Sequence, residues 1–299
     1  MKKILAIALT LTLILALAVM PTSAATLSSN WNEIWNMCLD ANGQQEQAGE
    51  AVADATGAIT LNNDGFGWFS KVGLVYNEKV TVDGLELIIS IDNLYDGADL
   101  PGMPTALTSF VNVILSADKA DNFVQYDVTD GTNPMGGFSN GLNMTAATSA
   151  ALTFAMNNDR ASWSAFGGLD SAIKVSYENL YGNFADEADI TVKFVANGDN
   201  IDILLDGQVA MSFAAAEVLD ADGKAYLAFA ANGYGNAATN MTVKAINGQT
   251  ANSFLAAGGG TPYAPDAPES SEPETPSEPE SSIVITPPAE NKGGCGNNA

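Results

Sequence analysis

The stretch DITVKFVANGDNIDILLDGQVAMSF, from Asp189 to Phe213, decides the fold class of this 299-residue chain. Within it, every second residue is apolar over two runs: Ile190, Val192 and Phe194, then Ile201, Ile203 and Leu205. Alternation of this kind places one face of a β-strand against a core. Asn197-Gly198 and Asp206-Gly207 interrupt the pattern, and such pairs favour two-residue turns. The stretch therefore predicts antiparallel strands joined by two tight hairpins.

Short β-type runs separated by glycine, asparagine and aspartate continue this pattern from Gly57 onward. The other runs are Ala58–Leu61, Trp68–Tyr76, Lys79–Val82, Leu85–Ile91, Phe110–Ser116, Phe123–Val128, Leu152–Asn157, Ala172–Tyr177, Ala225–Ala230 and Met241–Ile246. Many short strands with little helical periodicity are typical of an all-β sandwich. We expect one antiparallel two-sheet β-sandwich over residues 57–257, large enough to bury its own core.

Two segments have helical rather than strand character. Asn30–Leu39 begins with a capping asparagine, has Glu33 at the capping-box position and continues with an apolar stripe. We therefore expect a short helix there, within an N-terminal lead-in over residues 26–56, and its two tryptophans are expected to pack on the core. A second short helix is expected at Ala214–Leu219.

The N-terminus has the pattern of a secretory signal. Two lysines precede an apolar run over residues 4–20, which is followed by Pro21 and four small residues. This pattern predicts that residues 1–25 are a signal peptide, removed after Ala24 or Ala25. The alternative is an uncleaved anchor, because the run approaches the length that a membrane span requires. The helix-breaking proline before the small residues favours cleavage.

Residues 258–299 differ in composition from the rest of the chain. After a glycine hinge, most of the twelve prolines fall between Thr261 and Pro288 and alternate with glutamates, so no packed core can form. Proline stiffness and like-charge repulsion predict an extended, disordered stalk.

The stalk ends in the cluster GGCG, Gly293–Gly296. This ending resembles the C-termini of Gram-positive bacterial surface proteins, in which a comparable cluster precedes an apolar span and a basic tail. The chain stops at Ala299 with neither. We expect an extracellular protein that is secreted or attached to the bacterial cell surface, through an anchor missing from this chain or through Cys295.

The charge balance limits both partners and chemistry. Eleven basic residues oppose 35 acidic ones, which gives a formal net charge of −24 at pH 7. Such a surface repels nucleic acid and anionic membranes, so we expect no nucleic acid partner and no membrane contact beyond the signal peptide or an anchor. The chain has no histidine. This excludes catalytic triads that contain histidine, metal sites with histidine ligands and acid–base catalysis by histidine. Cys38 is expected to be a buried thiol.

Three segments carry a family resemblance: GLVYNEKVTVDGLELIISIDNL (Gly73–Leu94), DITVKFVANGDNIDILLDG (Asp189–Gly207) and KAYLAFAANGYGNAATNMTVKAINGQ (Lys224–Gln249). They are similar to the opening strands, a late hairpin and the closing strands of the concanavalin A-like lectin/glucanase superfamily. The resemblance implies a jelly roll of two stacked antiparallel sheets, one face of which is concave. Ligands of that superfamily usually lie across the concave face.

Carbohydrate binding needs exposed aromatic rings that stack on sugars, with polar groups beside them. The candidate rings are those of Trp68, Tyr126, Trp163, Tyr177 and Tyr234. A single aromatic residue in a strand more often belongs to the core. Because Trp163 in RASWSAF and Tyr234 in ANGYGN have small and polar neighbours, we expect these two to be the best ligand-binding candidates.

Calcium is the metal that this residue inventory can hold, since it takes oxygen ligands. Asp92, Asp96 and Asp99 in DNLYDGAD are the candidate ligands. They do not match the EF-hand spacing, and Asp-Gly pairs also form ordinary solvated turns. A turn without metal is therefore the alternative, and no other cofactor is expected.

No catalytic residue is assigned from the sequence. Glucanases of the resembled superfamily carry acids at alternating positions of one strand, so that two carboxylates face one sugar. No segment has that pattern, and Glu86 stands alone in LELIISID. Three functions remain: a non-catalytic lectin-like module that binds an extracellular glycan, which we favour; a glycoside hydrolase with an unrecognised pair of acids; and a structural or adhesive surface protein without a glycan ligand.

Overall fold

The computed structural model describes residues 25–39, 45–46, 49–63, 68–93, 109–117, 149–156, 162–169, 181–233 and 239–265. Within these residues, no helix has the length and apolar character needed to cross a membrane. The chain divides into two units, residues 1–263 and 264–299. All the strands described below belong to the first unit.

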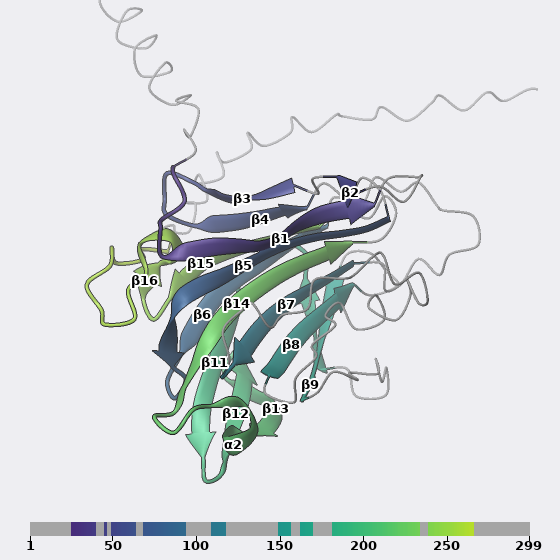
Figure 1. The fold of residues 1–299 in the computed structure, drawn as a ribbon. Helices are drawn as coiled ribbons and strands as arrows, with labels where there is room; N and C mark the ends of the chain where they lie inside the picture. The colour runs from purple at the N-terminus through teal and green to yellow at the C-terminus, as the bar shows by residue number, and fades with distance from the viewer. Residues whose placement is uncertain are drawn as a thin grey trace, which may run out of the picture. The chain divides into compact units, whose positions relative to one another are not determined.

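The first sheet has eight strands in the order β10-β9-β8-β7-β14-β5-β1-β2 (Figure 1). Its strands are β1 (Trp31–Leu39), β2 (Gln45–Glu46), β5 (Trp68–Thr81), β7 (Ser109–Ser116), β8 (Ser149–Met156), β9 (Ser162–Leu169), β10 (Tyr181–Ala185) and β14 (Lys224–Gly233). Every neighbouring pair in it is antiparallel.

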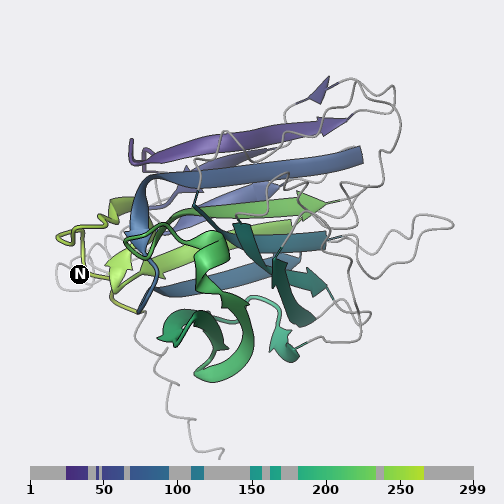
Figure 2. The same cartoon turned by 60° about the horizontal axis from the view of Figure 1, so that its bottom comes forward.

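The second sheet has the order β13-β12-β11-β6-β15-β4-β3, with β16 paired to β15. Its strands are β3 (Gly49–Ala53), β4 (Ile59–Asn63), β6 (Glu86–Asn93), β11 (Ile190–Asn197), β12 (Asn200–Leu205), β13 (Gln208–Ala214), β15 (Thr239–Ile246) and β16 (Gln249–Thr250). The chain changes sheet repeatedly, as in β5–β6–β7 and β13–β14–β15, and Figures 1 and 2 show the two layers stacked. The expected all-β, two-sheet antiparallel jelly-roll sandwich is confirmed.

The core lies between the two sheets. Leu61 and Ile89 of the second sheet and Leu74 and Phe229 of the first are fully buried, and burying each such side chain contributes about 1.5–3 kcal/mol. The second sheet is apolar on one face, because the outward side chains of β6 remain partly exposed. In the first sheet, by contrast, consecutive residues of β14 from Leu227 to Ala231 are all buried. The central strand β14 is therefore buried on both faces of that sheet.

The hairpins predicted from Asp189–Phe213 are confirmed as β11-β12-β13. Asn197 pairs with Asn200, and Leu205 pairs with Gln208. The second turn needs left-handed backbone at Asp206 (φ 48°) and Gly207 (φ 80°), which is the geometry that Asp-Gly favours. The short helix expected at Ala214–Leu219 is also confirmed, as α2 (Ala215–Val218).

The helix expected at Asn30–Leu39 is wrong, because this segment is the strand β1. Tertiary contacts replace both local capping interactions. Glu33 accepts a hydrogen bond from the backbone N–H of Ala51 at 2.6 Å, and the Asn30 side-chain amide donates to the carbonyl of Phe254 at 3.5 Å. Trp31 is buried among aromatic residues as expected, with its ring centroid 5.1 Å from that of Tyr76. Pairing with β5 therefore outweighs a weak helical preference.

Other strands differ from the expected runs. Trp68–Tyr76 and Lys79–Val82 form the single strand β5, whereas β3, β9 and β10 were not expected. The runs Phe123–Val128 and Ala172–Tyr177 lie outside the described residues.

The sandwich also continues beyond the boundary expected at residue 257. The N–H of Thr250 donates to the carbonyl of Thr261, and the N–H of Tyr263 donates to that of Gly248, both at 2.8 Å. The first unit accordingly ends at Tyr263.

Candidate functional site

The strands of the sandwich meet their connections at two opposite ends. We call one the turn end, because residues 54–58, 82–85, 198–199 and 247–248 connect strands there by short turns. We call the other the loop end, where β1, β4, β6, β8 and β14 finish. The register places these termini together: Gly233 pairs with Ser70 and Ser109, and Thr239 pairs with Asn63 and Asn93. The loop end lies toward the right in Figure 1.

Trp68 and Gly233, the residue before Tyr234, lie at neighbouring strand termini at the loop end. Trp68 is the first residue of β5 and pairs with Leu39, the last residue of β1. Tyr234 directly follows Gly233, which pairs with Ser70 two positions after Trp68. Tyr234 itself lies outside the described residues. The topology thus joins two aromatic positions that are far apart in sequence.

Tyr126 and Tyr177 also lie outside the described residues. The strand ends that flank their segments belong to the turn end: Ser116 pairs with Ser149, and Leu169 pairs with Ala150. Their chain segments therefore do not leave the sheets at the loop end, where Trp68 and Gly233 lie.

Trp163 is placed in the core, so the expectation that it is an exposed sugar platform is wrong. Its side chain is 0% exposed, and its indole Nε1 donates to Asp186 Oδ1 at 2.8 Å. Ser162–Phe166 of RASWSAF belong to strand β9, in which Trp163 pairs with Met156 and points inward with the core residue Ala165. Small polar neighbours suggested an exposed ring, whereas here they lie on the opposite face of a strand.

Asp92 is the one predicted calcium ligand among the described residues, since Asp96 and Asp99 lie outside them. It is the last residue of β6 whose side chain points out of the sandwich, and it pairs with Asn240 of β15. Burial raises its pKa above the usual aspartate value, and the nearby charges of Asp186 and Glu187 raise it further. Among the described residues, no cluster of three acidic or cysteine side chains is arranged to hold a metal.

Glu187 reaches Asp92 because of a backbone turn between β10 and β11. Its φ is 62°, a left-handed conformation that is uncommon outside glycine, and its N–H donates to the carbonyl of Ile91 at 2.8 Å. Acids that are separate in sequence, in NFADEAD and at the end of LELIISID, thus become neighbours at the loop end. Sequence spacing gives no signal for this contact, which depends on pairing between β6 and β11.

The first residues of β15 carry two buried oxygen atoms that lack a hydrogen-bond partner in the described part of the chain. They are Thr239 Oγ1 and Asn240 Oδ1. Thr239 faces the core and is 0% exposed, and Asn240 lies on the outward side opposite Asp92. A buried polar group without a partner costs about 1–3 kcal/mol, so such groups call for a water or ligand atom.

A polar pair that sequence reasoning missed lies on the face of the first sheet that is turned away from the second. Asn112 Nδ2 donates to Thr153 Oγ1 at 2.7 Å, and both side chains are fully buried. The same cross-strand row continues through Ala230 and Gly73. Its signal was an asparagine in the middle of the apolar run VNVIL, which was interpreted only as a strand.

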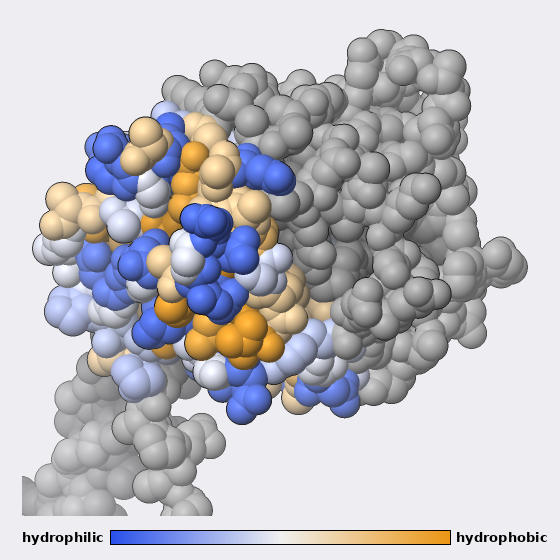
Figure 3. Space-filling view, turned by 90° about the horizontal axis from the view of Figure 1, so that it is seen from below, coloured by the Kyte–Doolittle hydropathy of each residue, from blue (hydrophilic) through white to orange (hydrophobic). Residues whose placement is uncertain are grey.

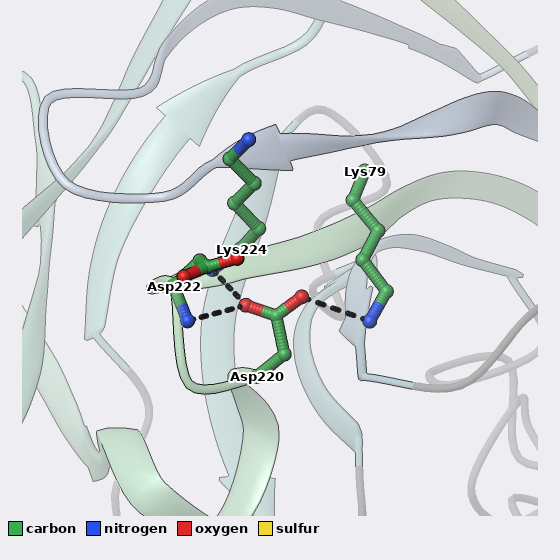
Figure 4. A network of polar contacts seen from close by, with 4 residues as sticks. All are labelled: Lys79, Asp220, Asp222 and Lys224. Atoms are coloured by element: carbon green, nitrogen blue, oxygen red, sulfur yellow. Dashed lines mark hydrogen bonds and ion pairs between the residues drawn. The ribbon is translucent and has the colours of Figure 1, made fainter.

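Charged groups at the turn end have structural partners. Asp220 Oδ2 accepts from Lys79 Nζ at 2.9 Å, and its Oδ1 accepts from the backbone N–H groups of Asp222 and Lys224 (Figure 4). The Lys79 hydrogen bond is the main cause that lowers the pKa of Asp220, followed by the one from Lys224. Glu86, the lone acid of its strand, is paired with Lys193 at 3.0 Å. These contacts hold turns and strands in place.

The described surface has no extended apolar platform. The exposed large hydrophobic side chains on it are Val209 and Leu255, at 59% and 39%. Figure 3 shows the lower side of the molecule, where hydrophilic residues surround small apolar patches. Isolated apolar residues of this kind are normal on soluble domains.

Comparison with known proteins gives a likeness of fold. No protein-family model and no curated protein matches the chain. Similar solved structures include the Emp47p carbohydrate recognition domain (12% identity, 74% of this chain and 89% of that chain, TM-score 0.41) and a legume lectin-like domain from Entamoeba histolytica (10%, 77% and 97%, 0.40). A glycoside hydrolase family protein from Mycobacterium thermorestibile is also similar (10%, 74% and 93%, 0.41). The set contains both carbohydrate recognition domains and a glycoside hydrolase family protein.

Proposed function

We propose that this protein is a secreted or surface-displayed, non-catalytic lectin-like module that binds an extracellular glycan at the loop end of its sandwich. The observation that carries the proposal is the convergence of the strand termini next to Trp68 and Tyr234. Connections that leave a rigid sandwich at one end are the usual place for binding residues, and aromatic rings with polar neighbours suit sugars.

Polar groups at the same end support the proposal. Asn240 and Asp92 face outward at the termini of β15 and β6, and the amide oxygen of Asn240 is buried without a partner among the described residues. Sugar hydroxyls both donate and accept hydrogen bonds, so one of them can donate a hydrogen bond to the amide oxygen of Asn240. With a net charge of −24, binding of a neutral glycan by stacking and hydrogen bonds is more favourable than binding of an anionic one.

The last residue of the first unit lies at the opposite end of the sandwich from the proposed site. The first unit ends at Tyr263, which is hydrogen-bonded to Gly248 at the turn end. The signal-like N-terminus and the Pro/Glu-rich stalk are the sequence features behind the proposed secretion or display.

A glycan array tests the proposal, using the mature chain of residues 26–299. Tyr234 and Tyr226 form a matched pair, since Tyr226 lies near the start of β14 at the turn end and Tyr234 directly follows its last residue. We expect Tyr234→Ala to weaken binding to the best array glycan at least tenfold, as the loss of about 1.4 kcal/mol implies, and Tyr226→Ala to leave it unchanged. Equal effects of the two variants would contradict a loop-end site. No binding to any glycan would favour the structural or adhesive alternative.

A second candidate function is glycoside hydrolysis, favoured by the raised pKa of Asp92, which results first from burial and then from the nearby charges of Asp186 and Glu187. A carboxyl group with a raised pKa beside an ionised carboxylate is the arrangement that glycosidases use for their general acid. The experiment is a reducing-sugar assay over a broad set of polysaccharides. Activity that disappears in both Asp92→Asn and Asp186→Asn would support it, and the absence of sugar release from every substrate would exclude it.

A further inference from the structure

We propose that the free edge of β13 binds an extended segment of another protein, which adds to the second sheet as a further strand and carries basic residues at its ends. An edge strand offers a row of backbone N–H and C=O groups with which such a segment can pair. The four edges of the two sheets differ in how far these groups are accessible. The proposal does not depend on a glycan ligand.

The opposite edge of the second sheet, β3, is blocked by the chain itself. The N–H of Ala51 donates to Glu33 Oε1 at 2.6 Å, and the carbonyl of Ala53 accepts from the N–H of Ala25 at 2.8 Å. Both bonds lead away from β4, so they use backbone groups that an added strand needs. β3 also contains Glu50, and a charged residue on an edge opposes pairing with another chain.

The edges of the first sheet are short and irregular. β2 has two residues, and β10 has five. The register between β10 and β9 shifts between Tyr181 and Phe184, and Gly182 has a φ of 71°. The carbonyl of Gly182 also accepts from the Ser164 hydroxyl at 3.2 Å. Short edge strands and irregular register both hinder pairing with another chain.

β13 is longer than these edges and is open. It has seven residues, Gln208–Ala214, and in the described part of the chain it pairs with β12 and with no other strand. A bulge at Ala210 interrupts the register, but the pairs from Met211–Ile203 to Ala214–Asn200 are regular. β13 contains neither a charged residue nor a proline, the residue types that commonly protect an edge. Its backbone groups are therefore available to an added strand.

Side chains of β13 offer contacts on both faces of the sheet. Val209 is 59% exposed and lies opposite Leu204 of β12. Met211 lies opposite Ile203, packs against the core and is partly buried. Because Ile203 and Leu204 are successive residues, Val209 and Met211 are on opposite faces. An added strand with alternating side chains can cover Met211 on one face and Val209 on the other.

The charges around β13 favour a basic partner. Residues 194–223 contain no lysine or arginine and six acidic residues, which are Asp199, Asp202, Asp206, Glu217, Asp220 and Asp222. A second copy of this chain would bring the same acids and a net charge of −24, so like-charge repulsion opposes pairing of two β13 edges. A segment with lysine or arginine at both ends places cations near Asp206, before β13, and Glu217, after it.

Amide hydrogen exchange on the mature chain of residues 26–299, followed by NMR, tests the proposal with a synthetic strand. The probe is the peptide acetyl-KKTVTVTVKK-amide. A control peptide of equal charge, acetyl-KKTVPVTVKK-amide, has a central proline, which removes a backbone donor and fixes φ. We expect the probe to slow amide exchange within Gln208–Ala214 and to leave β3 unchanged. The proline peptide is expected to leave both strands unchanged.

Two substitutions form a matched pair on the protein. Val209 and Leu255 are the exposed large hydrophobic residues of the described surface, and lysine at either position changes the net charge equally. We expect Val209→Lys to weaken binding of the probe at least tenfold, or about 1.4 kcal/mol, because a lysine on the edge repels the basic peptide and opposes pairing. Leu255→Lys is expected to leave binding unchanged. Both side chains are exposed, so the fold should tolerate either substitution.

Three results would overturn the proposal: unchanged amide exchange within β13, equal binding of the two peptides, or equal effects of the two lysine variants. Equal binding of the proline peptide would mean that charge alone attracts the probe. Sedimentation of the unmodified chain without peptide gives a further check. A dimer whose β13 amides are already protected would identify a second copy as the occupant of this edge and would likewise overturn the proposal.

Discussion

The two ends of this sandwich differ in what their residues do. At the turn end, side chains and backbone satisfy one another: Asp220 caps the turn before β14, and Asn247 Oδ1 accepts from the N–H of Glu86 at 2.8 Å. At the loop end, Thr239 and Asn240 carry buried oxygens without a partner in the described residues, and Asp92 faces other acids. Polar groups that cost stability tend to be kept where they serve function. The contrast favours the loop end as the binding end.

The largest predicted effect is the loss of stability when an aromatic residue of the core is removed, compared with the removal of an aromatic residue of the proposed site. Trp163→Ala removes a fully buried ring and the indole that donates to Asp186, so we expect it to lower the free energy of unfolding by about 3–5 kcal/mol. Urea unfolding of the mature chain measures it. Tyr234→Ala serves as the comparison and is expected to weaken glycan binding with little change in stability. If Trp163→Ala unfolds at the same urea concentration as the unmodified chain, Trp163 is not a core residue.

The next effect compares two buried threonines through the same substitution. Thr239→Val removes a hydroxyl that has no partner in the described residues, so we expect a gain in stability of about 1 kcal/mol. Thr153→Val removes the acceptor of the Asn112 amide, and we expect a loss of about 1–3 kcal/mol. Chemical denaturation measures both. If Thr239→Val is destabilising, the hydroxyl has a bound partner, and the unpaired state inferred for the loop end is wrong.

Two aspartates predict opposite pH dependence at the two ends. The folded state raises the pKa of Asp92, so its contribution to stability is present below the unfolded pKa and is lost as pH rises through the folded pKa. Asp92→Asn should therefore raise the melting temperature at pH 7 and have little effect in strong acid. The pKa of Asp220 is lowered, so its contribution is present above the unfolded pKa and is lost as pH falls through the folded pKa. Asp220→Asn should lower the melting temperature at pH 7 only.

Thermal melts of both variants and of the unmodified chain, from pH 3 to 8, check these signs. A destabilising effect of Asp92→Asn at neutral pH would mean that its carboxylate is bound by a cation or a donor rather than repelled. That result would support calcium binding by Asp92, Asp96 and Asp99. A chelator would then lower the melting temperature of the unmodified chain.

The smallest effect is expected for the ion pair between Glu86 and Lys193. Both side chains are more than 40% exposed, and pairs of this kind contribute about 0–1 kcal/mol. Glu86→Gln should change the urea midpoint only slightly and should not affect glycan binding. A loss of any polysaccharide-degrading activity in this variant would instead identify Glu86 as a catalytic acid.

The scaffold was largely predictable because its signals are local. Alternation over Ile190–Phe194 and the Asn-Gly and Asp-Gly turns depend only on neighbouring residues, and the hairpins formed as expected. β1 was missed because its pairing with β5 and the Glu33–Ala51 contact are not local. Trp163 was expected to be exposed for a related reason, since small polar residues on the opposite face of a strand suggest an exposed segment when the sheet is unknown.

The candidate site was predictable in its residue types but not in its geometry. Aromatics and aspartates could be named, yet only the strand register shows that Trp68 and the residue before Tyr234 occupy neighbouring strand ends. The contact between Asp92 and the Asp186-Glu187 turn likewise depends on how β6 pairs with β11. Periodicity within one strand contains no information about which strands become neighbours.

The most direct test of the account is an NMR titration of the mature chain with the oligosaccharide that binds best on the array. The account predicts that backbone amide signals shift at Ser70, Asn93, Gly233 and Asn240, at the loop end, while those of Gly84, Gly198 and Gly248, at the turn end, stay in place. Shifts concentrated at the turn end, or spread over the outward face of the second sheet far from Asn93 and Asn240, would contradict it.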